Sequence, residues 1–127
     1  TPDPFLNYEA HPDHYYTGKL ASAAVIFSGL PLFNKSDLER GLNPHSPRFV
    51  AYYYTSKPNT IVDVSAFLNK KIEALKKHRS QFVENSMLNI IVEYMKITGR
   101  KIKVDFAEEF KILPTSLLHI MPIAEYI

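Results

Sequence analysis

Two histidines and one aspartate lie within four residues near the start of this chain, around a proline, and could take part in metal chemistry. They are His11, Asp13 and His14, in the stretch AHPDHYYTG. Imidazole is a good zinc ligand, and a carboxylate on the second ring nitrogen fixes the tautomer and orientation of a functional histidine. In a second interpretation Asp13 caps the helix that follows, and the histidines are polar loop residues. The tetrapeptide alone favours the second interpretation, because short motifs recur by chance.

Other polar and aromatic residues have simpler explanations. Three consecutive tyrosines at 52–54 could stack against a sugar, but packing within a sheet explains them better. His45 and Arg48 could contact a polar substrate, and a surface role explains them equally well. His119 lies in the apolar stretch LLHIMPIAEYI, which favours a core or interface position.

Composition excludes several classes of function. The chain has 15 basic and 13 acidic residues, and a net charge of +2 is too balanced for nucleic-acid binding through charge. Cysteine is absent, which excludes a disulfide framework and a thiolate metal cage and fits a cytoplasmic location. No apolar run approaches the roughly 20 residues that a membrane span requires. A length of 127 residues, 46% of them hydrophobic, indicates one globular domain, residues 1–127.

Apolar periodicity and turn residues predict alternating helices and strands. Leu20, Ala23 and Phe27 recur at helical spacing, which predicts a helix from Tyr15 to Ser28. The other predicted elements are a surface loop over 34–47, strands over 48–55 and 60–64, a helix capped by Asp63 or Ser65 that runs through Leu75, a helix over 86–99 that Gly99 ends, and a short strand followed by a turn within 101–113.

This alternation favours a layered α/β fold. Two clear strands and one further candidate are few for a sheet that carries three helices, since a typical sheet has about five or six strands. The first helix has no preceding strand except the few residues before His11, and the chain begins at Thr1 without a methionine. We therefore expect the first half of an α/β domain to come from a companion N-terminal segment or chain.

Several segments, taken in order, resemble the LmbE-like (PIG-L) zinc-dependent N-deacetylases. AHPDHYYTGKLASAAVIFSGLPLF is similar to the second motif of that family and its following helix. Later segments of the family resemble NPHSPRFVAYYY, TIVDVS and KIEALKKHRSQF, and its C-terminal segment resembles GRKIKVDFAEEFKI, with Phe106 in place of a tyrosine. The resemblance covers nearly the whole chain. It is greatest to members that deacetylate N-acetylglucosamine conjugates, such as bacillithiol-pathway enzymes and acetylchitobiose deacetylases.

The resemblance implies a Rossmann-like three-layer sandwich of which this chain holds the C-terminal part. It also implies that His14 binds zinc, that His11 polarises the acetamide carbonyl or stabilises the oxyanion, and that Asp13 orients His11. The N-terminal motif of the family, His-Pro-Asp-Asp-Glu, supplies two further zinc ligands and the general base, and it has no match here. We therefore expect at most one of about three protein zinc ligands in this chain, and no activity from the isolated chain.

The predicted function is the C-terminal part of a zinc-dependent N-deacetylase that hydrolyses the acetamide of an N-acetylglucosaminyl compound to a free amine and acetate. Zn2+ is the expected cofactor, a small N-acetylated sugar the expected substrate, and a homo-oligomer the expected assembly. Two alternatives remain open: a non-catalytic sugar-binding or scaffold domain of the same fold, and an unrelated small α/β regulatory module.

Overall fold

A computed structural model describes residues 1–6, 10–82 and 85–120 of the chain. These residues divide into two compact units. The first unit holds Thr1–Thr60 and the segment from Phe110 onward, and the second holds Ile61–Glu109. The expectation of a single domain over residues 1–127 stays a prediction.

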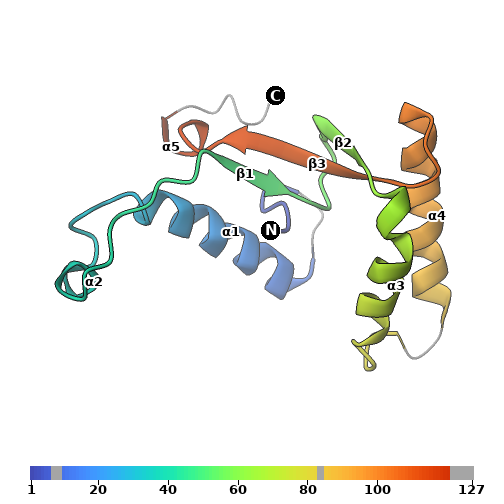
Figure 1. The fold of residues 1–127 in the computed structure, drawn as a ribbon, viewed down its shortest axis with the longest axis horizontal. Helices are drawn as coiled ribbons and strands as arrows, with labels where there is room; N and C mark the ends of the chain where they lie inside the picture. The colour runs from blue at the N-terminus through green and yellow to red at the C-terminus, as the bar shows by residue number, and fades with distance from the viewer. Residues whose placement is uncertain (7–9, 83–84, 121–127) are drawn as a thin grey trace. The chain divides into compact units, whose positions relative to one another are not determined.

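The described residues form both helices and a small sheet, which confirms a fold that mixes the two (Figure 1). The elements, in order, are α1 (Pro12–Phe27), α2 (Lys35–Glu39), β1 (Phe49–Tyr52), β2 (Thr60–Asp63), the 3-10 helix η1 (Ser65–Phe67), α3 (Leu68–Lys76), α4 (Asn85–Ile102), β3 (Ala107–Pro114) and α5 (Leu117–Ile120). Within the described ranges, no helix combines the length and the apolar character that a membrane crossing requires.

The three named strands form one sheet in the order β1-β3-β2. β1 runs antiparallel to β3, with Phe49 opposite Pro114 at one end and Tyr52 opposite Lys111 at the other. Apolar side chains of this pair make the core of the first unit, in which Val50, Tyr52 and Leu113 are buried. Helix α1 contacts β1, so the strand pair supports the helix that begins at the histidine motif (Figure 1).

Residues at the start of the chain pair with the residue that follows β1. Pro2 forms a parallel bridge with Tyr53, the residue after β1. The amide of Asp3 donates to the carbonyl of Tyr53 at 2.9 Å, and the amide of Tyr53 donates to the carbonyl of Thr1 at 3.0 Å. The same segment passes close to α1 at Gly18, where a Cβ atom would lie 2.6 Å from the carbonyl oxygen of Pro2. A glycine is therefore required at this crossing.

Two predictions in the first unit need correction. The strand expected over 48–55 ends at Tyr52, because Tyr54 has a positive φ of 55° that an extended strand cannot contain. The loop expected over 34–47 contains the short helix α2. Side chains stabilise this turn locally, since Ser36 Oγ donates to Asn34 Oδ1 at 2.8 Å and Asn34 Nδ2 donates to Asp37 Oδ2 at 2.7 Å.

The helix expected over 86–99 continues through Gly99 to Ile102. Its end is a Schellman motif, in which Val104 N donates to Gly99 O at 3.0 Å and Lys103, at φ 61°, takes the left-handed conformation. Gly99 is needed for packing, because a Cβ there would lie 2.6 Å from the carbonyl oxygen of Val104. The glycine therefore allows the chain to fold back closely on α4 and does not end the helix.

The order predicted for residues 101–113 is also wrong, because the turn comes first and the strand β3 follows it. The alternation of Ile102 and Val104 belongs to the end of α4 and its cap. In β3 the carboxylate of Glu108 pairs with Lys71 and that of Glu109 with Lys101, so the two acidic residues are compensated by lysines from helices. Because of these charged residues, the sequence does not indicate that β3 is the central strand of the sheet.

Candidate metal and catalytic site

The histidine motif lies at the start of α1. Pro12 is the first helical residue and His11 is the N-cap. Proline suits this position, because its φ is already helical and its missing N–H has no intrahelical partner to lose. The helix therefore begins three residues before the predicted Tyr15. The cap is His11, which corrects the interpretation in which Asp13 caps the helix.

The imidazole of His11 is held by the backbone of its own helix. Its Nδ1 accepts a hydrogen bond from the amide of Asp13 at 3.2 Å. An accepting Nδ1 must carry a lone pair, so the proton of the neutral ring is on Nε2. This contact gives the neutral ring of His11 one defined tautomer, with the proton on Nε2.

His14 lies one helical turn after His11, and the two rings stack with centroids 4.7 Å apart and an angle of 25° between their planes. His11 is exposed, whereas His14 is half-buried. Asp13 lies between them in the first turn of the helix and is exposed. Its negative charge is favourable at a helix N-terminus. All three residues predicted for the site therefore lie together, and the roles assigned to them stay predictions.

Tyr54, one of the three tyrosines for which the sequence favoured packing within a sheet, is a neighbour of this motif. Its ring centroid lies 6.1 Å from that of His14. The three tyrosines at 52–54, considered together in the sequence, have different environments. Tyr52 is buried, shares a hydrogen bond of 2.7 Å with Ser22 Oγ, and has its pKa raised by burial. Tyr54 is 58% exposed and has a left-handed backbone conformation, which no sequence pattern indicates.

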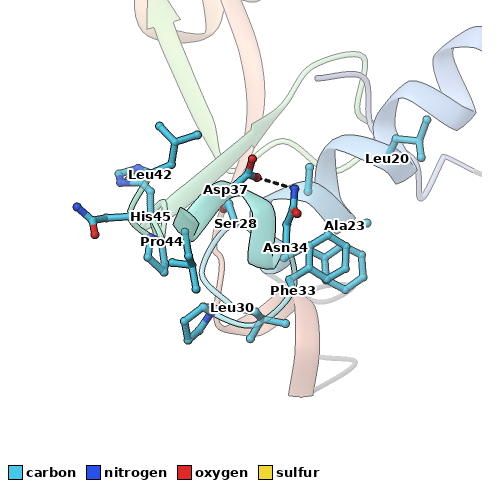
Figure 2. Close-up of a pocket in the computed structure, with 15 residues that line it drawn as sticks. Leu20, Ala23, Ser28, Leu30, Phe33, Asn34, Asp37, Leu42, Pro44 and His45 are labelled. Carbon is cyan, nitrogen blue, oxygen red and sulfur yellow. Dashed lines mark hydrogen bonds between the residues drawn. The ribbon is translucent and has the colours of Figure 1, made fainter. Parts of the chain in front are cut away.

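A hollow of about 600 Å³ lies at the opposite end of α1 (Figure 2). Most of its lining is apolar, from the C-terminal half of α1, the following loop and α2, and the rings of Phe27 and Phe33 stack there at 4.4 Å. His45 lines this hollow, and its amide donates to Ser28 O at 2.9 Å. Ser28 follows α1, about 20 Å along the helix axis from His14 at 1.5 Å per residue. The structure therefore separates His45 from the histidine motif.

The remaining candidate residues also lie away from the motif or outside the described side chains. The Arg48 side chain is exposed, and its carbonyl accepts from the amide of Thr115 at 3.1 Å. The backbone of His119 belongs to α5, and its side chain lies outside the described part of the structure.

The chain is similar in sequence and in structure to known proteins. No family model matches the chain. The chain is 44% identical over 133 aligned residues to a diacetylchitobiose deacetylase of Thermococcus kodakarensis, covering 99% of this chain and 48% of that protein. A solved structure of N,N'-diacetylchitobiose deacetylase from Pyrococcus horikoshii, complexed with its inhibitor MPG, superposes with a TM-score of 0.86 at 44% identity. That match covers 100% of this chain and 49% of the solved chain.

The chain is a relative of these deacetylases. The resemblance to LmbE-like deacetylases predicted from the sequence is thereby confirmed, and the matched part of the curated relative is its C-terminal half. The chain spans about half the length of the relatives it matches. Their activity therefore applies to this chain only as a proposal.

Few potential metal ligands lie close together in the described part of the chain. Among residues 1–6, 10–82 and 85–120, no three or more His, Cys, Asp or Glu side chains gather where they could hold a metal ion. His14 fits as a single ligand, because its imidazole is half-buried at the end of a fixed helix. His11 is less suited, because its Nδ1 already accepts from the helix backbone.

Proposed function

We propose that residues 1–127 form the C-terminal part of a zinc-dependent N-deacetylase. The complete protein hydrolyses the acetamide of an N-acetylglucosaminyl compound to a free amine and acetate. The observation that carries this proposal is 44% identity over 99% of the chain to a diacetylchitobiose deacetylase. The position of His11, Asp13 and His14 at one helix start supports it, because the three side chains lie within a single turn.

His14 is the zinc ligand in this proposal. When bound, the ion would lower the pKa of a water molecule well below its usual value and so supply a nucleophile at neutral pH. The stacked ring of His11 restricts the rotation of His14 on one side. Because a catalytic zinc has about three protein ligands, the other ligands come from outside the described residues.

His11 acts on the acetamide. Its Nε2–H donates to the carbonyl oxygen and then to the oxyanion that forms as water adds, where a positioned donor has its largest effect. The amide of Asp13 keeps the proton on Nε2. In this proposal Asp13 also orients the ring of His11, and the leaving amine would receive the proton that the general base takes from the attacking water.

The rest of the predicted assembly belongs to the same proposal. A companion N-terminal segment or chain supplies the base and the remaining zinc ligands and completes a Rossmann-like three-layer sandwich. Exposed apolar side chains beside the hollow support a covering partner, since Leu20 is 70% and Leu32 is 74% exposed. We propose a homo-oligomer in the cytoplasm as the state of the complete protein.

A chimaera tests the function without knowledge of the companion. Residues 1–127 replace the C-terminal half of the Thermococcus kodakarensis relative, and acetate and free amine are measured with diacetylchitobiose as substrate. The chimaera should release acetate, lose this activity to a chelator, and regain it with zinc. The intact relative is the positive control. A folded chimaera that binds the sugar but releases no acetate would instead support the non-catalytic sugar-binding or scaffold domain.

A further inference from the structure

Tyr54 has an uncommon backbone conformation for its residue type. Its φ of 55° lies in the left-handed region, which glycine adopts readily and bulky aromatic residues rarely adopt. Gly41, by comparison, meets the same demand with a glycine, at φ 79°. Non-glycine residues in this region gather at functional sites, where the surrounding structure holds them in place.

The positive φ changes the direction of the side chain. In an extended strand, residues two apart point to the same face, so an extended Tyr54 would follow Tyr52 towards the core. Tyr52 is fully buried, whereas Tyr54 is 58% exposed and its ring lies 6.1 Å from the ring of His14. The left-handed residue therefore removes an aromatic ring from the core side and places it beside the proposed zinc ligand.

A second tyrosine supports this ring. Tyr53 meets Tyr54 edge to face, with ring centroids 5.1 Å apart and planes at 76°. The backbone of Tyr53 is fixed on both sides, by hydrogen bonds with Thr1 and Asp3. The ring of Tyr54 is thus exposed, supported by Tyr53 and close to His14, and such a ring is suited to contact a bound molecule.

We propose that Tyr54 is a substrate-binding residue whose exposed ring packs against the sugar ring that carries the acetamide. The inference rests on the proposed deacetylase function. A pyranose ring presents C–H groups on its faces and hydroxyls at its edge, which matches the apolar face and polar tip of tyrosine. Packing at this position holds the acetamide next to His11 and His14. Because the contact is made equally in the ground state and the transition state, it affects KM more than kcat.

The test compares Tyr54→Gly and Tyr54→Phe in the chimaera of residues 1–127 with the Thermococcus kodakarensis half. Glycine removes the ring and suits the left-handed backbone, so Tyr54→Gly should fold. Its KM for diacetylchitobiose should rise about tenfold, with kcat within about threefold and zinc content unchanged. Tyr54→Phe should keep KM within about threefold, because the ring remains.

Phe49→Ala is the matched control, since Phe49 is also 58% exposed and lies at the other end of β1. Its KM should equal that of the parent chimaera. An unchanged KM in Tyr54→Gly, with the parent active, would overturn the inference. An inactive parent would overturn the proposed function alone. In that case the Kd for chitobiose is measured by calorimetry. A Kd that rises about tenfold in Tyr54→Gly supports the contact between Tyr54 and the sugar, and an unchanged Kd rejects it.

Discussion

His11 and His14 have different surroundings, although they lie one turn apart. The helix backbone occupies Nδ1 of His11, which leaves a single donor, Nε2–H, directed by the cap geometry. His14 is half-buried between the ring of His11 and the ring of Tyr54. A donor that the backbone orients suits an oxyanion, and a side chain that its neighbours confine suits a metal. The two histidines are therefore not interchangeable.

This division predicts different losses at the two positions. In the chimaera, His11→Ala should retain zinc and lose rate by about 100- to 1,000-fold, the effect of one oxyanion donor. His11→Asn separates catalysis from capping, because asparagine is a strong N-cap residue and should keep the stability of α1 while the rate falls equally. Asp13→Asn should show a smaller loss of rate. Steady-state kinetics and zinc analysis of the same preparations make the comparison, and an unchanged rate in His11→Asn would exclude this role.

Among the elements, several could be placed from local sequence patterns, although some of their ends lie elsewhere. The helix around Leu20, the strand before Tyr53 and the second strand lie where they were expected. These elements are determined mainly by residues close together in the sequence, so a local sequence pattern can predict them. The cap predicted at Asp63 or Ser65 was wrong, because the N-cap of α3 is Phe67, without a side-chain cap hydrogen bond. Asp63 instead closes a local turn, in which its Oδ1 accepts from the amide of Ser65 at 2.9 Å.

Elements that depend on distant contacts were not predictable. β3 contains two glutamates and the buried Lys111, and only its partners across the sheet and on the helices make such a strand stable. The position of Tyr54 depends on a left-handed backbone, which the sequence motif Tyr-Tyr-Tyr does not indicate. The sequence around Gly18 likewise does not indicate that a glycine is required, because the requirement comes from the close approach of Pro2 to α1 at that residue.

The contact between α4 and β3 predicts a pH dependence in the second unit. Burial raises the pKa of Glu109, but hydrogen bonds from Lys101 Nζ at 2.5 Å and Tyr94 Oη at 2.8 Å lower it below its usual value. A carboxyl whose pKa is lower in the folded state than in the unfolded state stabilises the fold. This contribution is fully present when the pH is above the pKa of the unfolded state, about 4.3. That contribution is lost as the pH falls through the folded pKa.

Glu109→Gln should therefore weaken the protection of α4 and β3 amides at pH 7 and change it little once the wild-type carboxyl is protonated. The loss at neutral pH should be roughly 0.5–1 kcal/mol, the range of a partly exposed ion pair. Protection factors from hydrogen exchange in the chimaera, measured from pH 7 to pH 3, provide the comparison. Glu73→Gln, at an exposed position on α3, is the control. A difference between wild type and Glu109→Gln that does not shrink in acid would contradict the assignment.

For the whole molecule, two observations lead to the same proposal: the exposure of apolar side chains and the share of its relatives' length that the chain covers. Leu20, Leu32 and Phe33 are each at least 60% exposed, and Leu20 and Phe33 line one hollow, so apolar side chains gather on this face. The chain also corresponds to about half of its deacetylase relatives. Both observations support the proposal that another segment or chain completes the fold and the metal site.

Zinc content per chain, measured by mass spectrometry after dialysis, tests most directly whether the motif is one part of a shared zinc site. The chimaera should retain about one zinc ion per chain, and residues 1–127 alone should retain none. His14→Ala in the chimaera should reduce zinc to background, whereas His45→Ala, at the separate hollow, should leave it unchanged. Full zinc in the His14→Ala chimaera, or tightly bound stoichiometric zinc in the isolated chain, would contradict the account.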